Sequence, residues 1–280
     1  MILWHTFVNL LPFEWAQYSF MHNALLAICI ITPLFALLGC TVINNQMAFF
    51  SEAIGHAGLT GIAIGVLAGI ANPLWAMIVF AILIAIGVTL LRRYSAASSD
   101  TVIGIIMAFT VAVGVLLLSR GGGFNKYSQY LIGDILSITQ YEIFSLLVVF
   151  VIFLICWIFL FNRLFLVSIN SSLARSRNIN IWLMQAIIAI VTAVIVTVSL
   201  QWVGILVINA LIILPAAASR NMARSIAQYL WGAIVISLLS GICGLIVSYY
   251  WSTATGATIV IFAMTLYLGT LVVGRVKGRG

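Results

Sequence analysis

The sequence predicts an all-α integral membrane protein, a polytopic bundle of about eight or nine transmembrane helices. Hydrophobic residues make up 64% of the 280-residue chain and charged residues only 6%, whereas soluble domains carry roughly 25% charged residues. The mean hydropathy is +1.26. Apolar runs of about 20 residues, the length that crosses a bilayer, recur along the chain. We therefore expect a single transmembrane domain over residues 1–280.

Residues 1–18 precede the first long apolar run. They combine several aromatic side chains with Pro12 and Glu14. This mixture is typical of an interfacial segment whose rings lie at the level of the lipid headgroups. We expect residues 1–18 to lie on the membrane and do not count them as a span.

Nine apolar runs are long enough to cross the membrane. Some are short, so eight crossings are expected if one of them is re-entrant. The nine runs are Asn23 to Val42, Ala53 to Gly69, Pro73 to Leu91, Val102 to Ser119, Tyr141 to Phe161, Ile181 to Leu200, Val203 to Ala218, Gln228 to Tyr250 and Ala257 to Val273.

The basic residues predict the orientation, because Lys and Arg favour cytoplasmic loops. If the first span runs inward, ten of the twelve basic residues fall on one side, and only Arg120 and Lys126 fall on the other. This places the N-terminus outside and the C-terminus in the cytoplasm. The net charge of +7 does not indicate nucleic acid, because the basic residues form no long cluster. We expect membrane lipid around the chain and no nucleic-acid partner.

The sharpest chemical signal is the pair Glu52 and His56. On a helix these residues lie one turn apart on one face, so both could bind one cation. Inserting an acidic side chain near the centre of a membrane helix costs about 2.5 to 3.5 kcal/mol. This cost indicates that Glu52 has a functional role. The alternative is that Glu52, at the headgroup boundary, caps the second span together with Ser51, and that His56 donates to a backbone carbonyl.

Glycines after this pair predict how its helix packs. They recur every three or four residues from Gly55 to Gly69. Small residues on one face let neighbouring helices approach closely. We expect the second span to be a central, tightly packed helix.

Three further positions could line a permeation path or serve the fold. Asp100 follows two serines just before the fourth span, where capping of a helix alone would explain it. Asn209 and Pro215 interrupt the seventh run, where an asparagine can bond across helices and a proline frees a carbonyl. A simple kink explains these two equally well.

The segment of residues 162–180 is a long polar connection on the cytoplasmic side. It contains Arg175 and Arg177 among several serines and asparagines. A short surface helix that docks against a soluble partner and a solvated linker fit this composition equally well.

Well-known catalytic motifs are absent from the sequence. No GxxxxGK[ST] loop is present, so this chain is not expected to bind ATP in the usual manner. HExxH and GxSxG motifs are also missing, which removes the best-marked metalloprotease and serine-hydrolase interpretations. We therefore do not expect the chain to be an enzyme of these classes.

Several stretches together resemble the zinc/manganese permease family of bacterial ABC transporters. The resemblance covers nearly the whole chain in the right order, and its most distinctive block begins with Val203-Gly204-Ile205-Leu206 and ends with Pro215-Ala216-Ala217. The other similar stretches are Phe20 to Ala27, Met47 to Gly65, Ser99 to Ile105 and Leu131 to Ile138.

This resemblance implies an all-helical permease in the bacterial plasma membrane that works as a homodimer. Two copies of a cytoplasmic ATPase and an extracytoplasmic metal-binding lipoprotein would be its partners. The metal-handling residues of the family fall on Glu52 and His56. Its coupling segment falls on residues 170–180, with the contact residues Ser171, Ser172, Leu173, Ala174 and Arg175. No permanently bound cofactor is implied, only a transported divalent metal.

The chain departs from the family pattern at two places. Glu52 stands where relatives mostly carry aspartate, which lengthens the ligand arm by one methylene. The coupling segment lacks the acids and the terminal glycine of the family and has Asn178 among its replacements. The run Leu59 to Gly65 lacks a proline common in manganese-type relatives, so the resemblance favours zinc over manganese.

Two other classes of function use the same pair. A membrane-embedded metalloenzyme would bind a metal and water there, and a proton-coupled secondary transporter would protonate Glu52 and His56. In the permease, His must be neutral and Glu ionised to bind metal. Uptake should therefore weaken when acid protonates the imidazole.

Overall fold

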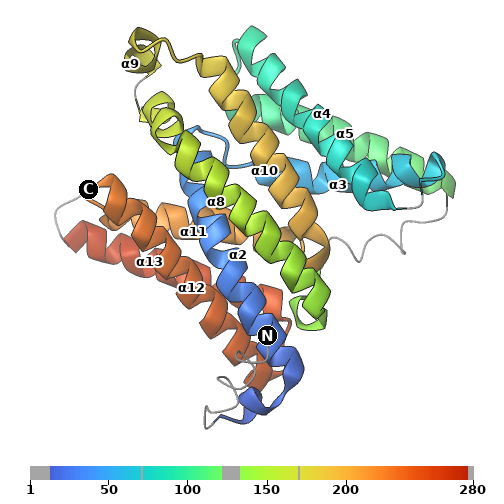
Figure 1. Cartoon of the computed structure of the whole chain (residues 1–280), viewed down its shortest axis with the longest axis vertical. Helices are drawn as coiled ribbons and strands as arrows, with labels where there is room; N and C mark the ends of the chain where they lie inside the picture. Colours follow the sequence, from blue (N-terminus) through green and yellow to red (C-terminus); the bar gives the residue numbers. More distant parts are fainter. Residues whose placement is uncertain (1–12, 71, 122–132, 170, 277–280) are drawn as a thin grey trace. The chain divides into compact units, whose positions relative to one another are not determined.

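The computed structural model describes residues 13–70, 72–121, 133–169 and 171–276, and every long element in these ranges is an α-helix. Nine of the described helices are long and apolar enough to span a membrane, which confirms the predicted class and the count of nine. They are α2 (Ser19–Asn44), α3 (Phe50–Leu67), α4 (Pro73–Tyr94), α5 (Ser99–Gly121), α8 (Gln140–Ile169), α10 (Ile181–Val203), α11 (Ile205–Met222), α12 (Ile226–Trp251) and α13 (Thr255–Val276) (Figure 1).

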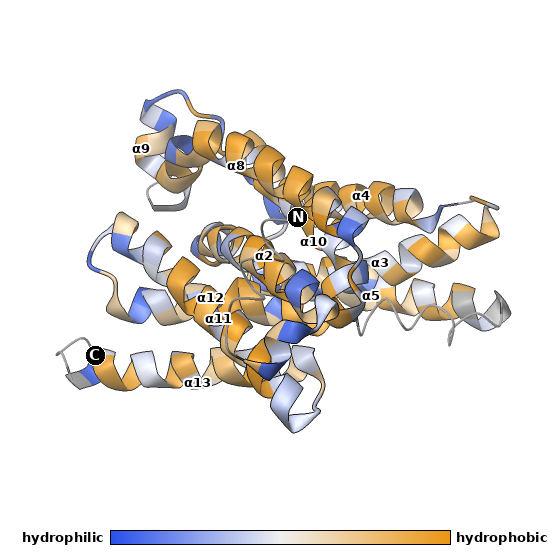
Figure 2. Ribbon diagram, turned by 60° about the horizontal axis from the view of Figure 1, so that its bottom comes forward, coloured by the Kyte–Doolittle hydropathy of each residue, from blue (hydrophilic) through white to orange (hydrophobic). Residues whose placement is uncertain are grey.

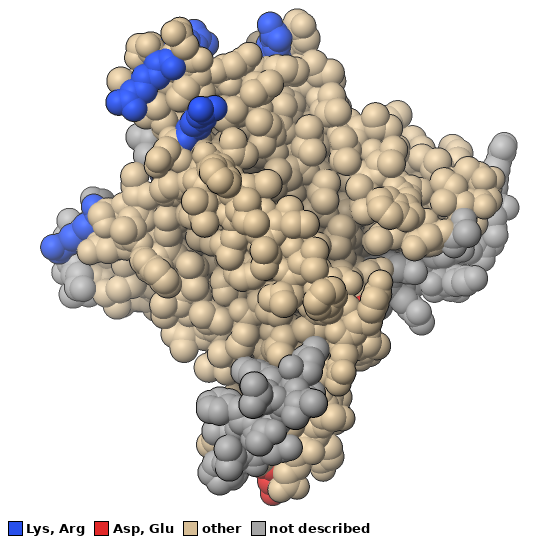
Figure 3. All heavy atoms as spheres, in the orientation of Figure 1, with Lys and Arg blue, Asp and Glu red and all other residues tan. Residues whose placement is uncertain are grey.

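Three short elements connect the spans. The 3-10 helix η1 (Glu14–Gln17) precedes α2, and the 3-10 helix η2 (Ile135–Ser137) precedes α8. The α-helix α9 (Ser171–Ser176) lies between α8 and α10. Apolar residues colour almost the whole of α8 (Figure 2), and uncharged residues cover nearly all of the face seen in Figure 3.

The chain divides into two compact units by its internal contacts. Unit 1 takes its residues from Met1–Cys40, Asp134–Ile152 and Ala210–Gly280, and unit 2 from Thr41–Gly133 and Phe153–Asn209. Helices α8 and α11 each contribute to both units. Both units consist of membrane spans, and the single transmembrane domain over residues 1–280 stays a prediction.

Unit 1 is held together by close contacts between spans. A Cβ atom added to Gly39 of α2 would lie 1.9 Å from the carbonyl oxygen of Ile212 in α11, so only glycine fits there. The Ser237 hydroxyl of α12 donates to the Thr32 carbonyl of α2 at 3.0 Å. Close backbone approach and interhelical hydrogen bonds are the usual means of packing in lipid.

Unit 2 is built around α3. This helix packs against α4, α5 and α10, and 12 of its 18 residues are buried. A Cβ atom at Gly61 would stand 2.8 Å from the Cα atom of Met77 in α4, so the glycine permits this crossing. Within unit 2, the prediction of a central and tightly packed second span is confirmed.

The predicted end of the fifth span was wrong. We expected a loop from Phe161, but α8 continues to Ile169. No glycine or proline interrupts the chain here, and Leu164 and Val167 are buried against Met184 and Ile188 of α10. Burial of these apolar side chains extends the helix beyond the predicted membrane boundary.

The N-terminal segment is described only from residue 13 onward, because residues 1–12 lie outside the described ranges. Trp15 is only 5% exposed, whereas Phe13 and Tyr18 are about half exposed. His22 is likewise buried, and its Nε2 atom lies 2.6 Å from the Ala16 carbonyl. Trp15 therefore belongs to the core of unit 1, and the interfacial position of residues 1–18 stays a prediction.

Candidate functional site

The N-terminus of α3 carries the predicted metal-binding pair. Its N-cap residue is Phe49, and no side chain caps it. Ser51 and Glu52 therefore do not occupy the N-cap position that the capping alternative expected. Ser51 lies inside the helix, fully buried, and its hydroxyl has no hydrogen-bond partner. Glu52 lies in the first turn, where the partial positive charge of the helix end favours a carboxylate.

Glu52 and His56 lie on the one accessible stripe of this part of α3. Between Phe50 and Ala63, every residue is buried except Glu52, His56 and Leu59, which are half-buried. These positions are spaced i, i+4 and i+7, so they follow one another along a single helix face. The carboxylate and the imidazole therefore face the same side of a helix segment that is otherwise buried from Phe50 to Ala63.

Tight packing on the other faces of α3 fixes the direction of this stripe. The Thr60 hydroxyl donates to the Thr110 carbonyl of α5 at 2.7 Å. A Cβ atom at Gly55 would meet the side chain of Ile205 in α11, and one at Gly58 would touch Met77 in α4 and Leu200 in α10. Since α3 cannot rotate without disturbing these contacts, the two ligand-capable side chains are held in place.

The pair does not form a complete metal cage. In the described part of the chain, no group of three or more His, Cys, Asp or Glu side chains could hold a metal ion. A structural zinc site has four protein ligands, whereas transient or catalytic sites keep open positions. Glu52 and His56 can supply two ligands, and hydroxyls, backbone carbonyls, water or another chain would complete the coordination.

Asp100 is exposed in the first turn of α5. It does not cap this helix: the Ser98 hydroxyl accepts from the Thr101 N–H at 3.2 Å and also bonds the Thr101 hydroxyl at 2.8 Å. Asp100 interacts electrostatically with Arg92 at the end of α4. This acid therefore balances charge at the ends of α4 and α5.

Asn209 and Pro215 both lie within α11, which runs unbroken from Ile205 to Met222. The predicted interruption is therefore absent, although Pro215 is inside the helix and buried. Asn209 is half-buried and its Oδ1 atom has no hydrogen-bond partner. Asn209 belongs to unit 2 with α3, whereas Pro215 belongs to unit 1.

Sequence reasoning missed a group of buried hydroxyls on α10. The side-chain oxygens of Thr192, Thr197 and Ser199 are buried and have no hydrogen-bond partner. Buried hydroxyls normally find an acceptor, so three unpartnered hydroxyls on one span are unusual. Their signal in the sequence was three hydroxyl residues within one apolar span, a pattern that is common in membrane helices and therefore weak.

The predicted coupling segment contains the short helix α9, which Ser171 begins and Ser176 ends. Of the predicted contact residues, Ala174 is fully buried against Leu164 and Met184, whereas Ser172, Leu173 and Arg175 are exposed. Ile179, just after the helix, packs against the same cluster. The segment is thus a short surface helix, and its contact with a soluble partner stays a prediction.

Asn178 explains how the segment ends without its expected glycine. Its φ angle is +56°, in the left-handed region that glycine and, less readily, asparagine adopt. The N–H of Asn178 donates to the Arg175 carbonyl and the N–H of Ile179 to the Ala174 carbonyl, both at 3.0 Å. These two bonds form a Schellman motif, so Asn178 takes the structural place of the glycine.

Comparison with known proteins gives consistent matches over nearly the whole chain. The family model described as ABC 3 transport family matches residues 17–274. The high-affinity zinc uptake system membrane protein ZnuB of Haemophilus influenzae is 31% identical over 256 residues, which cover 91% of this chain and 98% of that protein. The manganese import system permease protein ScaB of Streptococcus parasanguinis is 30% identical over 256 residues, 90% of each chain.

A solved structure shares the fold. PsaBC from Streptococcus pneumoniae in complex with Fab matches with a TM-score of 0.77 and 26% sequence identity, covering 96% of this chain and 95% of that one. The similar proteins thus include one named for zinc and one named for manganese.

Proposed function

Because the chain belongs to the ABC 3 transport family, we propose that it is the membrane permease subunit of an ATP-driven importer for a divalent transition-metal ion. Zinc is the first candidate, manganese the second, and iron a third within the same family. The chain itself transports, and a separate cytoplasmic subunit hydrolyses ATP.

The observation that carries this proposal is the accessible stripe of α3. Glu52 and His56 are half-buried and capable of binding a metal, and apart from Leu59 the residues around them from Phe50 to Ala63 are buried. Carboxylate and imidazole together suit zinc and manganese. A metal stripped of most of its water would bind this pair transiently, and the small number of ligands would let it leave again when the helices reorient.

The unpartnered polar atoms of unit 2 support a hydrophilic route beside α3. The hydroxyls of Ser51 and Ser199 and the amide oxygen of Asn209 are buried without a partner. Neutral oxygen atoms of this kind can replace water around a cation without adding charge. They would lower the cost of moving a partly dehydrated ion through the permease.

The assembly that we propose has two copies of this chain, two ATPase subunits and an extracytoplasmic lipoprotein that delivers the metal. The N-terminus lies outside and the C-terminus in the cytoplasm, as the distribution of Lys and Arg predicts. In this arrangement α9 faces the ATPase, with Ser172 and Leu173 exposed for contact while Ala174 anchors the helix.

Zinc uptake by the reconstituted complex tests the proposed site. Glu52→Gln and His56→Ala should each lower ATP-dependent uptake at least tenfold, because loss of a ligand from a two-residue site leaves a single ligand. Glu142→Gln is the matched control, since Glu142 makes a capping box with Thr139 that glutamine also forms. Normal uptake by both site variants would contradict the assignment of Glu52 and His56.

The same preparation separates the permease from its rivals. Vesicles that contain the chain without the ATPase should take up no metal. Uptake driven by a proton gradient in such vesicles would instead indicate a secondary transporter. Metal-dependent turnover of a substrate by the purified chain alone would indicate a membrane-embedded enzyme.

A further inference from the structure

A pocket lined by arginines lies in unit 2, where the end of α4 meets α9 and the start of α10. It has a volume of about 450 Å³. Arg92 and Arg93 come from the last turn of α4, and Arg175 comes from α9. None of the eight lining residues is acidic. This concentration of positive charge in a concave site indicates an anionic ligand.

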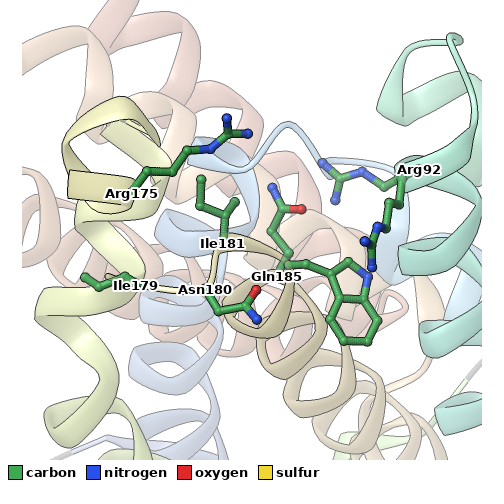
Figure 4. Close-up of a pocket in the computed structure, with 8 residues that line it drawn as sticks. Arg92, Arg175, Ile179, Asn180, Ile181 and Gln185 are labelled. Carbon is green, nitrogen blue, oxygen red and sulfur yellow. The ribbon is translucent and has the colours of Figure 1, made fainter. Parts of the chain in front are cut away.

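The arginines reach the pocket from opposite sides. Figure 4 shows Arg92 and Arg175 extending toward the same space, with Gln185 between them. Arg92 donates through Nη2 to the Asn45 carbonyl at 3.3 Å, which uses one of the five N–H donors of a guanidinium. Its electrostatic partner Asp100 supplies one negative charge against three positive ones.

The N-terminus of α10 adds further donors. Asn180 caps this 23-residue helix, its Oδ1 atom accepting from the Leu183 N–H at 3.2 Å. Ile181 and Trp182, also lining residues, occupy the first turn, whose N–H groups have no partner within the helix. The indole N–H of Trp182 is buried without an acceptor. Helix N-termini and arginines both favour phosphate groups.

The position of the pocket favours a lipid as the source of that phosphate. The pocket lies at the ends of two membrane spans, α4 and α10. Directly beside the lining residues, Leu90 and Leu91 on α4 and Leu183 on α10 are exposed, and acyl chains could cover them. Arg93 lies over the Trp182 ring at 5.8 Å, and Trp is typical of headgroup level. Basic pockets between spans bind anionic headgroups.

We propose that this pocket binds the phosphodiester headgroup of an anionic phospholipid. Bound there, the phosphate would join Arg175 of α9 to Arg92 and Arg93 of α4. The lipid would therefore brace the short α9 helix against the membrane spans of unit 2. The proposal does not depend on the metal site or on the identity of the metal.

The test measures thermal unfolding of the full-length chain, stripped of lipid in a neutral detergent, with a short-chain phosphatidylglycerol as the probe. Phosphatidylglycerol should stabilise the wild type, whereas phosphatidylcholine and inorganic phosphate should not. Arg93→Gln and Arg175→Gln should each weaken the apparent affinity for phosphatidylglycerol about tenfold, because each removes a charge-assisted hydrogen bond. Arg163→Gln is the matched control, since Arg163 is an exposed arginine outside the pocket.

Native mass spectrometry distinguishes a loss of lipid binding from poor folding of a variant. It counts phosphatidylglycerol molecules per folded chain, and one fewer should remain bound to Arg175→Gln than to Arg163→Gln. Arg175→Lys, which keeps the charge but loses the planar fork, should recover part of the binding.

Three results would overturn the proposal. An equal response of all variants to phosphatidylglycerol would show non-specific lipid binding. Stabilisation by inorganic phosphate as strong as that by the lipid would show a site for free anions. Loss of ATPase association in Arg175→Gln with unchanged lipid binding would show that Arg175 serves a protein contact instead.

Discussion

The Thr60 hydroxyl of α3 donates to the Thr110 carbonyl of α5 across a distance of 2.7 Å. Thr60 lies one turn beyond His56, on the enclosed part of the same helix. The bond therefore fixes the rotation of α3 about its axis, and with it the direction of the stripe that carries Glu52 and His56. A polar contact between two spans thus positions a functional pair elsewhere on the helix.

Removing this hydroxyl should loosen α3. We expect Thr60→Val to lower the free energy of unfolding by about 1 kcal/mol, since interhelical hydrogen bonds in membranes contribute about 0.6 to 2 kcal/mol. Thr60→Ser keeps the donor and should be nearly neutral. Denaturation in mixed micelles measures both variants, and equal stability of Thr60→Val and wild type would show that the bond contributes nothing.

The crossing of α3 and α4 predicts a second effect. At Gly61, a Cβ atom would lie 2.8 Å from the backbone of Met77, and backbone cannot yield as a flexible side chain does. Gly61→Ala should therefore destabilise the chain by about 1 to 3 kcal/mol, the usual cost of overpacking.

Gly87 of α4 offers the control for this substitution. Nothing lies within 4 Å of a Cβ atom built there, so Gly87→Ala should be neutral or stabilise by roughly 0.5 to 1 kcal/mol through helix propensity. The comparison is made by thermal unfolding of both variants. A Gly61→Ala variant as stable as Gly87→Ala would mean that α3 and α4 pack less closely than described.

The left-handed backbone of Asn178 predicts opposite effects of two small substitutions. Gly adopts a φ of +56° without strain, so Asn178→Gly should keep or slightly raise stability. Asn178→Ala should cost about 1 kcal/mol, because alanine keeps the Cβ strain of this conformation and loses the short polar side chain whose local hydrogen bonding lets asparagine adopt it. In the complex, the alanine variant should also lower the coupling of ATP hydrolysis to uptake, measured as metal transported per ATP. If both variants transported the same amount of metal per ATP, the backbone geometry at the end of α9 would not affect the coupling to the ATPase.

Much of the fold was predictable because hydropathy and span length are local properties. The nine spans and the glycine-lined packing of α3 followed from runs and spacings within single segments. The end of α8 was missed because it depends on the burial of Leu164 and Val167 against α10, a contact between segments distant in sequence.

In the candidate site too, features within one helix were predictable, whereas features that join distant segments were not. Glu52 and His56 lie four residues apart on one helix, so their spacing alone predicted a pair. The arginine pocket was not predictable, since Arg93 and Arg175 come from different helices. The sequence explained Arg93 by membrane orientation and Arg175 by the coupling segment. The cap of α5 was assigned to Asp100 because serine and aspartate are both good N-caps; only the hydrogen bond from Thr101 identifies Ser98.

The length of the Glu52 side chain gives the last prediction. Glu52→Asp withdraws the carboxylate by one methylene, about 1.5 Å, while His56 stays where the packing of α3 holds it. The distance between the two ligands then changes. Zinc, which prefers four close ligands, should respond more strongly than manganese, which accepts varied oxygen-rich coordination.

We expect Glu52→Asp to retain uptake but to change the ratio of zinc to manganese transport about tenfold, the scale on which small changes around a metal alter affinity. Competition between the two metals during ATP-dependent uptake measures this ratio. Glu52→Gln, which keeps the length and loses the charge, should instead reduce uptake of both metals. If Glu52→Asp left the ratio unchanged, the carboxylate would act on the ion through its charge alone and would not be a direct ligand.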